Sequence, residues 1–219
     1  MKAYPWTQIG AAVLVALSLV LVAAGDPSLD ERIEQAEPEL HALLTARDHH
    51  VDPWEVYEAI HNNQMRLILV DVRSDRDFNL FHLRHAKHIK PEALTGDFPL
   101  LATAVVLMSN DEALAEQAFK RLWVQGQKNT YIMAGGVNLW LQIFSTHPYT
   151  VDAKPVAKPD GTLRHEFTTA KGADYPFAHP PPAVHAFKHE THKAHHHTRE
   201  FKAKIKLLGP KKKKTGGCG

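Results

Sequence analysis

The chain has 219 residues, of which 44% are hydrophobic and 23% are charged, and its formal net charge is +2. These averages are ordinary for a globular protein, but they hide three unlike regions: residues 1–27 are apolar, residues 28–145 look globular, and residues 146–219 are rich in Pro, His and Lys. The single cysteine, Cys218, excludes an intramolecular disulfide and leaves a cysteine-based enzyme only a residue near the C-terminus.

The first region contains an uncharged run at residues 9–25, in which Ser18 is the only polar side chain. A bilayer is spanned by about 17–25 apolar residues in a helix. Lys2 precedes the run and Asp26 follows it, which favours a cytoplasmic N-terminus. We therefore predict a single-pass transmembrane helix that contacts the membrane through residues 9–25 and holds the domain on the extracytoplasmic side.

The same run also fits a cleaved signal peptide, because Val22-Ala23-Ala24 offers a small-residue cleavage site before Gly25. In that case residues 1–24 are removed and the protein is secreted. The segment before the run is poor in positive charge, which favours the uncleaved anchor. Both interpretations place the remaining chain outside the cytoplasm.

The globular region begins with two helical patterns. Apolar residues among charged ones predict a helix over residues 29–47, interrupted near Pro38. A second helix is predicted from Pro53 to about Asn62, because Asp52 suits the N-cap position and Pro53 the first turn.

Three short apolar runs follow, at residues 66–72, 104–108 and 130–133. Such runs, rich in branched side chains, are typical of strands that are buried on both faces. Between the second and third runs, residues 112–125 have the pattern of an amphipathic helix that stops at Gly126. Strands alternating with helices predict an α/β fold with a doubly wound parallel sheet flanked by helices.

Functional sites in such sheets lie beyond the C-terminal ends of the strands. Several motifs occur at or after these ends, in a fixed order. The first strand runs into Asp71-Val72-Arg73, and Asp77-Phe78, His82-Leu83 and Ala86 follow; the later motif is Gly135-Gly136-Val137 with Trp140. Over residues 50–145 this series resembles the rhodanese family.

Three positions depart from the family pattern: Asp77 stands where Glu is usual, and Phe81 and His85 stand where glycines are usual. The resemblance also places Ser109 at the position of the catalytic cysteine, because Leu122 and Gly126 fall at the family's offsets from it. A rhodanese uses that cysteine to accept sulfur from a donor such as thiosulfate and to pass it on as a persulfide. A serine hydroxyl is a much weaker nucleophile and forms no persulfide.

The loop after Ser109 carries Asp111 and Glu112. The family's loop holds an anion with backbone N–H groups at a helix N-terminus, and two carboxylates there would repel thiosulfate. We therefore predict no catalytic residues and a degenerate site at Ser109, with Asp71, Arg73, Asp111 and Glu112 nearby.

Ser109 has two further interpretations. It fits an N-cap in a capping box with Glu112, which is a structural role. It would be a hydrolase nucleophile only if His82 or His85 approached it, and the chain has no G-x-S-x-G elbow there. Asp71 and Arg73 are interpreted as a structural polar pair at a strand end.

The proline-rich region after residue 145 is predicted to be a largely irregular tail with two short strands, near residues 162–168 and 200–208. Within the tail, four histidines recur at helical spacing and would share one helix face as ligands for Zn²⁺ or Cu²⁺: His185, His189, His192 and His196. A solvated linker that becomes charged below about pH 6.5 is the simpler interpretation.

Three functions remain open from the sequence. The first is a membrane-anchored, non-catalytic rhodanese-like domain that binds or scaffolds an unidentified protein partner. The second is a sulfurtransferase or sulfur carrier that uses Cys218 or a partner's cysteine. The third is a metal-binding protein that acts through its His-rich tail. No basic, aromatic-rich motif indicates nucleic-acid binding.

Overall fold

The computed structural model describes residues 10–11, 13–15, 26–61, 66–99, 103–145, 152–182 and 201–206. Residues 10–11 and 13–15 are helical. No helix in the described part of the chain is long and apolar enough to cross a membrane. Most of the predicted span at residues 9–25 lies outside the described residues, so the anchor stays a prediction. The four predicted histidine ligands and Cys218 lie outside them as well.

The centre of the structure is a five-stranded sheet in the order β1-β5-β4-β2-β3, with every neighbouring pair parallel. The strands are β1 (His50–Val51), β2 (Arg66–Asp71), β3 (Lys87–His88), β4 (Thr103–Met108) and β5 (Thr130–Met133). The predicted α/β fold with a parallel sheet is therefore confirmed. The two-residue strands β1 and β3 were not predicted, because two residues are too few to show a hydrophobic period.

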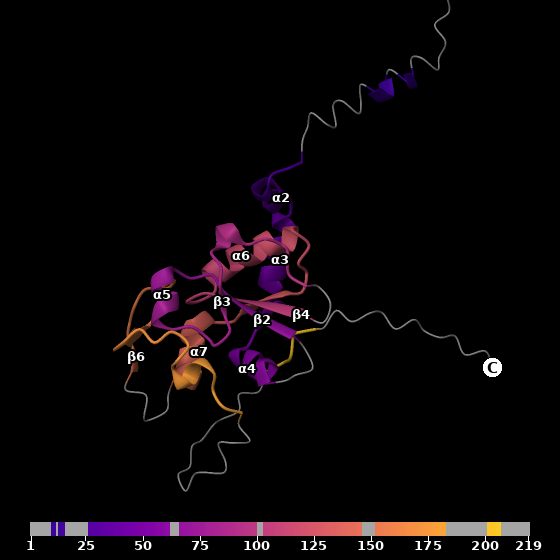
Figure 1. Cartoon of the computed structure of the whole chain (residues 1–219). Helices are drawn as coiled ribbons and strands as arrows, with labels where there is room; N and C mark the ends of the chain where they lie inside the picture. The colour runs from indigo at the N-terminus through magenta and orange to yellow at the C-terminus, as the bar shows by residue number, and fades with distance from the viewer. Residues whose placement is uncertain are drawn as a thin grey trace, which may run out of the picture.

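Helices cover both faces of this sheet (Figure 1). They are α2 (Leu29–Gln35), α3 (Glu37–Ala46), α4 (Pro53–His61), α5 (Asp75–Leu80), α6 (Ala113–Val124) and α7 (Gly136–Phe144), with 3₁₀ turns η1 (Pro91–Ala93) and η2 (Pro176–Ala178). The predicted interruption near Pro38 falls at Ala36, because proline is tolerated in the first turn of the new helix. Gly126 follows α6 with a φ of 91°, as predicted for a helix stop.

Side chains along the central strand β4 alternate between two cores, because successive residues of a strand point to opposite faces. Val105 and Leu107 pack in one core with α3 and α6. Val106 and Met108 pack in the other core with α4 and α7. All six residues of β4 are buried, which explains why the strand is continuously apolar.

Residues 152–182 pack against the domain, which was not predicted from the sequence. Strands β6 (Ala153–Pro155) and β7 (His165–Phe167) pair antiparallel, and Tyr175 and Phe177 are buried in the core beside α4 and α7. The indole of Trp140 donates a hydrogen bond of 2.8 Å to the Phe177 carbonyl oxygen. Two aromatic side chains bury enough apolar area to hold this proline-rich segment against the domain.

The predicted strand near residues 200–208 is absent from its described part, residues 201–206. The Lys204 and Ile205 amides donate to one carboxylate oxygen of Glu55, at 2.7 and 2.6 Å. The Lys206 amide donates to the Tyr131 hydroxyl at 2.8 Å. Side chains of the domain therefore replace the strand partner that an alternating pattern would normally require.

Candidate functional site

The polar pair predicted at the end of β2 is an internal ion pair. The Arg73 guanidinium contacts the Asp71 carboxylate through Nε and Nη2, with an Nη2–Oδ2 distance of 2.6 Å, and both side chains are fully buried. The Arg73 amide also donates to Asp71 Oδ1. Such a charge-assisted, two-pronged contact offsets the desolvation of two buried charges. The geometry fits a structural role.

Arg73 also joins the β2 exit to the loop after β4. Its Nη2 donates to the Phe81 carbonyl oxygen at 2.6 Å, and its Nη1 lies 3.4 Å from Asn110 Oδ1. Asn110 Nδ2 in turn donates to Asp77 Oδ2 at 2.8 Å. The structure thus brings Asp71 and Arg73 next to the Ser109 loop, as the parallel sheet predicts.

Ser109 is buried, with 1% of its surface exposed. Its Oγ donates to the Asp111 carbonyl oxygen at 3.0 Å and accepts from the Ala115 amide at 3.3 Å. Both partners are backbone groups, so neither activates the hydroxyl by taking its proton in the way a histidine does. His82, one of the two predicted candidate bases, stacks on Phe78 at 3.8 Å between ring centroids.

The predicted capping box between Ser109 and Glu112 is wrong. Helix α6 begins at Ala113 with Glu112 at the N-cap, and the N-cap side chain makes no capping hydrogen bond. The Glu112 carboxylate instead contacts the Arg47 guanidinium at 2.8 Å and accepts from the Gly135 amide at 2.7 Å. Tertiary partners far along the chain therefore override the local motif.

Asp111 fills the hydrogen-bonding positions of the loop with its own carboxylate. Its Oδ1 accepts from the Ala113 amide at 3.0 Å, and its Oδ2 accepts from the Gly161 amide. The Ala113 amide lies at the N-terminus of α6, where a bound anion would be stabilised. In this loop the carboxylate of Asp111 accepts from that amide.

Gly135 and Gly136 allow β5 and α7 to approach the loop. Both have positive φ, at 64° and 58°. A Cβ atom on Gly136 would lie 2.1 Å from the Asp111 carbonyl oxygen and 2.4 Å from that of Ser109. Any side chain here would force the loop away from α7, which explains the paired glycines of the motif.

Residues 159–164 cover the loop from the other side. The Gly161 carbonyl accepts from Asn110 Nδ2 at 3.1 Å. Asn138 of α7 donates to the Thr162 carbonyl at 2.8 Å and accepts from the Arg164 amide at 2.7 Å. The sequence analysis missed this contact, because its only local signal is the turn sequence Pro-Asp-Gly at residues 159–161.

A second polar cluster lies between the edge strand β1 and the first turns of α6. His50 Nε2 is 3.4 Å from Glu116 Oε1 and 3.7 Å from Glu112 Oε2. Burial lowers the pKa of the His50 imidazole. Burial raises the pKa of Glu112, but the hydrogen bonds from Arg47 and Gly135 outweigh it, and the pKa is lowered overall. None of these contacts was predicted from the sequence.

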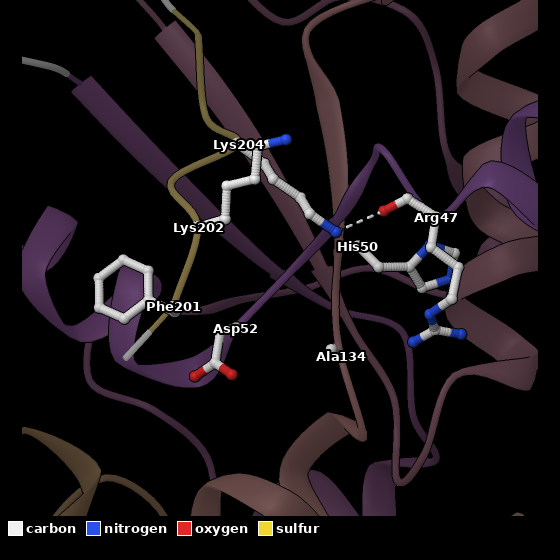
Figure 2. Close-up of a pocket in the computed structure, with 7 residues that line it drawn as sticks. All are labelled: Arg47, His50, Asp52, Ala134, Phe201, Lys202 and Lys204. Atoms are coloured by element: carbon white, nitrogen blue, oxygen red, sulfur yellow. Dashed lines mark hydrogen bonds between the residues drawn. The ribbon is translucent and has the colours of Figure 1, made fainter. Parts of the chain in front are cut away.

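A pocket of about 280 Å³ opens beside this cluster (Figure 2). Its lining includes Arg47 and His50, the strand ends at Asp52 and Ala134, and the side chains of Phe201, Lys202 and Lys204. Figure 2 shows Lys204 Nζ donating to the Arg47 carbonyl oxygen, at 2.7 Å. The pocket therefore lies along the edge strand β1, and Ser109 is not among its lining residues.

The chain was compared with known proteins. Residues 52–143 match the family described as rhodanese-like domain. No curated protein matches the chain.

Among solved structures, a Bacillus halodurans protein is 18% identical; the match covers 49% of this chain and 81% of that chain, with a TM-score of 0.40. A Lactobacillus plantarum protein is 19% identical, and the match covers 48% of this chain and 92% of that chain, with a TM-score of 0.40. The rhodanese-like domain of an Anabaena protein is 17% identical, and the match covers 51% of this chain and 92% of that chain, with a TM-score of 0.39. By the family match, residues 52–143 are similar to a rhodanese-like domain.

Proposed function

We propose that this rhodanese-like domain is a non-catalytic binding module, held at a membrane through residues 9–25, which presents its surface to a protein partner. The observation that carries the non-catalytic part is the bonding of the Ser109–Glu112 loop. Backbone donors at the Ala113, Ala115 and Gly135 amides are bonded by Asp111, Ser109 and Glu112. A substrate anion would have to displace these internal partners.

Sulfur transfer needs two things from this loop: a thiolate to accept the sulfur atom, and free donors to hold the donor anion. Ser109 supplies no thiolate, and its hydroxyl is bonded to backbone groups. The carboxylate of Asp111 stands where the anion would bind, bonded to Ala113 and Gly161. The missing thiolate and the occupied anion position are independent, so correcting one of them does not restore the reaction.

Sulfur transfer from thiosulfate to cyanide by the purified full-length chain tests this proposal. We expect no turnover above the background without enzyme, and none in Ser109→Cys, because Asp111 still fills the loop. The double variant Ser109→Cys with Asp111→Ala supplies a thiol and also frees the backbone donors of the loop, so it is the control for both changes together.

Two results would contradict the non-catalytic assignment. The first is turnover by the wild-type chain that is lost in Cys218→Ala, which would make Cys218 the sulfur carrier. The second is wild-type turnover that is retained in Cys218→Ala, which would place the chemistry elsewhere in the chain.

The membrane attachment is tested separately. Membranes from cells that express the full-length chain are washed with alkaline carbonate, which removes peripheral proteins. We expect the chain to stay with the membrane and a variant with three aspartates within residues 9–25 to be released, because charges at the centre of a bilayer-spanning helix are costly. A full-length chain recovered in the wash, or cut before Gly25, would overturn the anchor.

The binding role predicts that chemical cross-linking in membranes captures a protein partner of the domain. Capture of that partner should be equal for the wild type and for Ser109→Ala, since Ser109 is buried and plays no part in binding. Loss of the partner in Ser109→Ala, with the fold intact, would point back to chemistry in the loop.

A further inference from the structure

Three side chains from two elements converge outside the Ser109 loop: His50 of β1 with Glu112 and Glu116 at the start of α6. One ligand-type atom from each lies within 4.8 Å of the others. The His50 side chain is 1% exposed, and its Nε2 faces both carboxylates. An imidazole and two carboxylates form a donor set that suits a divalent cation.

The distances in this cluster are long for hydrogen bonds. His50 Nε2 lies 3.4 Å from Glu116 and 3.7 Å from Glu112, whereas a charge-assisted N–H···O bond is about 2.7–2.9 Å long. Two tetrahedral ligands of Zn²⁺, each about 2.1 Å from the ion, are about 3.4 Å apart. The distances from His50 Nε2 to the two carboxylates therefore fit an ion held between these groups, and the three ligand atoms all lie within 4.8 Å of one another.

The other ring nitrogen of His50 is buried, and it has no hydrogen-bond partner among the described residues. A protonated imidazole would need partners for both nitrogens, and burial lowers the pKa of this ring. The neutral imidazole, with a lone pair available on Nε2, is the form that binds a metal.

We propose that His50, Glu112 and Glu116 form a Zn²⁺ site that joins the edge strand β1 to the start of α6. Water from solvent takes the fourth position, because the Glu112 and Glu116 side chains are 22% and 35% exposed. Glu112 also accepts from the Gly135 amide, so the ion would be linked through Glu112 to the start of α7.

Arg47 competes with the metal. Its guanidinium binds both oxygens of Glu112, at 2.9 and 2.8 Å, and carries a positive charge into the cluster. The Arg47 side chain is half exposed, so it can leave Glu112 for solvent when an ion binds. Removing this charge should therefore strengthen metal binding, whereas a purely structural ion-pair network would only be weakened.

The test uses the full-length chain without a purification tag. Because the histidine-rich region binds metals by its composition alone, the tested background has Asn at the six histidines from residue 185 to 197 and Ala at Cys218. Zn²⁺ is titrated calorimetrically, and thermal unfolding is recorded with and without the ion. Mg²⁺, which prefers all-oxygen sites, is the cation control.

We expect one Zn²⁺ per chain and a rise in the unfolding temperature with Zn²⁺ but not with Mg²⁺. Glu116→Gln should weaken binding by more than about 10-fold, and it spares the fold because this side chain is 35% exposed. Glu92→Gln, at an exposed glutamate in η1, is the matched control and should bind like the background.

Arg47→Gln should bind Zn²⁺ about 10-fold more tightly, because one competing charge is gone. Absence of stoichiometric binding in the background would overturn the proposal. Equal affinities in Glu116→Gln and the background would overturn it too, as would weaker binding in Arg47→Gln. Thermal unfolding of each variant without Zn²⁺ shows that the fold is intact.

Discussion

Asp111 and Glu112 are neighbours in the chain, yet they belong to regions with opposite properties. Asp111 faces the Ser109 loop, where both of its oxygens accept backbone hydrogen bonds. Glu112 faces β1, where it binds Arg47 and lies 3.7 Å from the buried His50, whose Nε2 in turn lies 3.4 Å from Glu116. The first region is closed by the chain itself, whereas in the second the Nε2 of His50 has only these two long contacts among the described residues.

The difference shows that the loop indicated by the sequence has its polar groups bonded within the chain, whereas a cluster that the sequence did not indicate has longer contacts. Polar groups in a site that binds something are left for the ligand to satisfy, whereas those in a structural site bond to each other. By that criterion the polar groups of the Ser109 loop, which bond within the chain, fit a structural site. The cluster of His50, Glu112 and Glu116 is the better candidate for a ligand.

The largest effect on the closed region is expected from Arg73→Met, which leaves the Asp71 carboxylate buried and unpaired. The loss of unfolding free energy should be about 3–5 kcal/mol, measured by urea denaturation. Arg164→Met is the matched control, because its partner Asp160 is 91% exposed and the pair is worth about 0–1 kcal/mol. Equal effects of the two changes would mean that the buried pair does not hold the loop.

Gly136→Ala should come next. The added Cβ meets two carbonyl oxygens of the loop and requires a positive φ, so about 2–4 kcal/mol is expected. Gly126→Ala also needs a positive φ but has nothing within 4 Å of its Cβ, and about 1–2 kcal/mol is expected there. Urea denaturation measures the loss of unfolding free energy in both variants. A smaller loss in Gly136→Ala than in Gly126→Ala would show that the loop moves to accommodate the added Cβ.

Asn138→Ala tests the cover over the loop. It removes the bonds to the Thr162 carbonyl and the Arg164 amide and leaves both backbone groups to find water. About 1–3 kcal/mol should be lost, and limited proteolysis should cut residues 159–164 faster. An unchanged cleavage rate would show that Asn138 does not hold the cover in place.

The smallest effect concerns pH. Burial lowers the pKa of His165, in the strand that follows the cover, so the unfolded chain binds a proton more readily than the folded one. The stability from this group is complete above the unfolded pKa of about 6.5 and is lost as the pH falls through the lower folded value.

His165→Gln should therefore flatten the decline of the urea midpoint between pH 7 and pH 5. His41→Gln, at an exposed position of α3, is the control. A slope that is unchanged in His165→Gln would remove His165 as a cause of acid sensitivity.

Sequence patterns were sufficient for the interior of the sheet and for the order of its elements. The strands at residues 66–71, 103–108 and 130–133 overlap apolar runs, because the interior positions of strands that are buried on both faces are apolar. The Asp71–Arg73 pair was also predictable, since two residues two apart at a strand end are close whatever the fold. The capping box failed, because Arg47, 65 residues away, binds Glu112.

What the sequence determined by itself is therefore what depends on near neighbours: the strands, the amphipathic helix and the paired glycines. Only the tertiary structure placed Gly161 on Asp111, packed Tyr175 and Phe177 into the core, and brought His50 to Glu116. These contacts join segments that are far apart in the sequence, such as Asp111 and Gly161 or His50 and Glu116. They arise because the parallel sheet collects its loops at one edge, and no local pattern records which of those loops will meet.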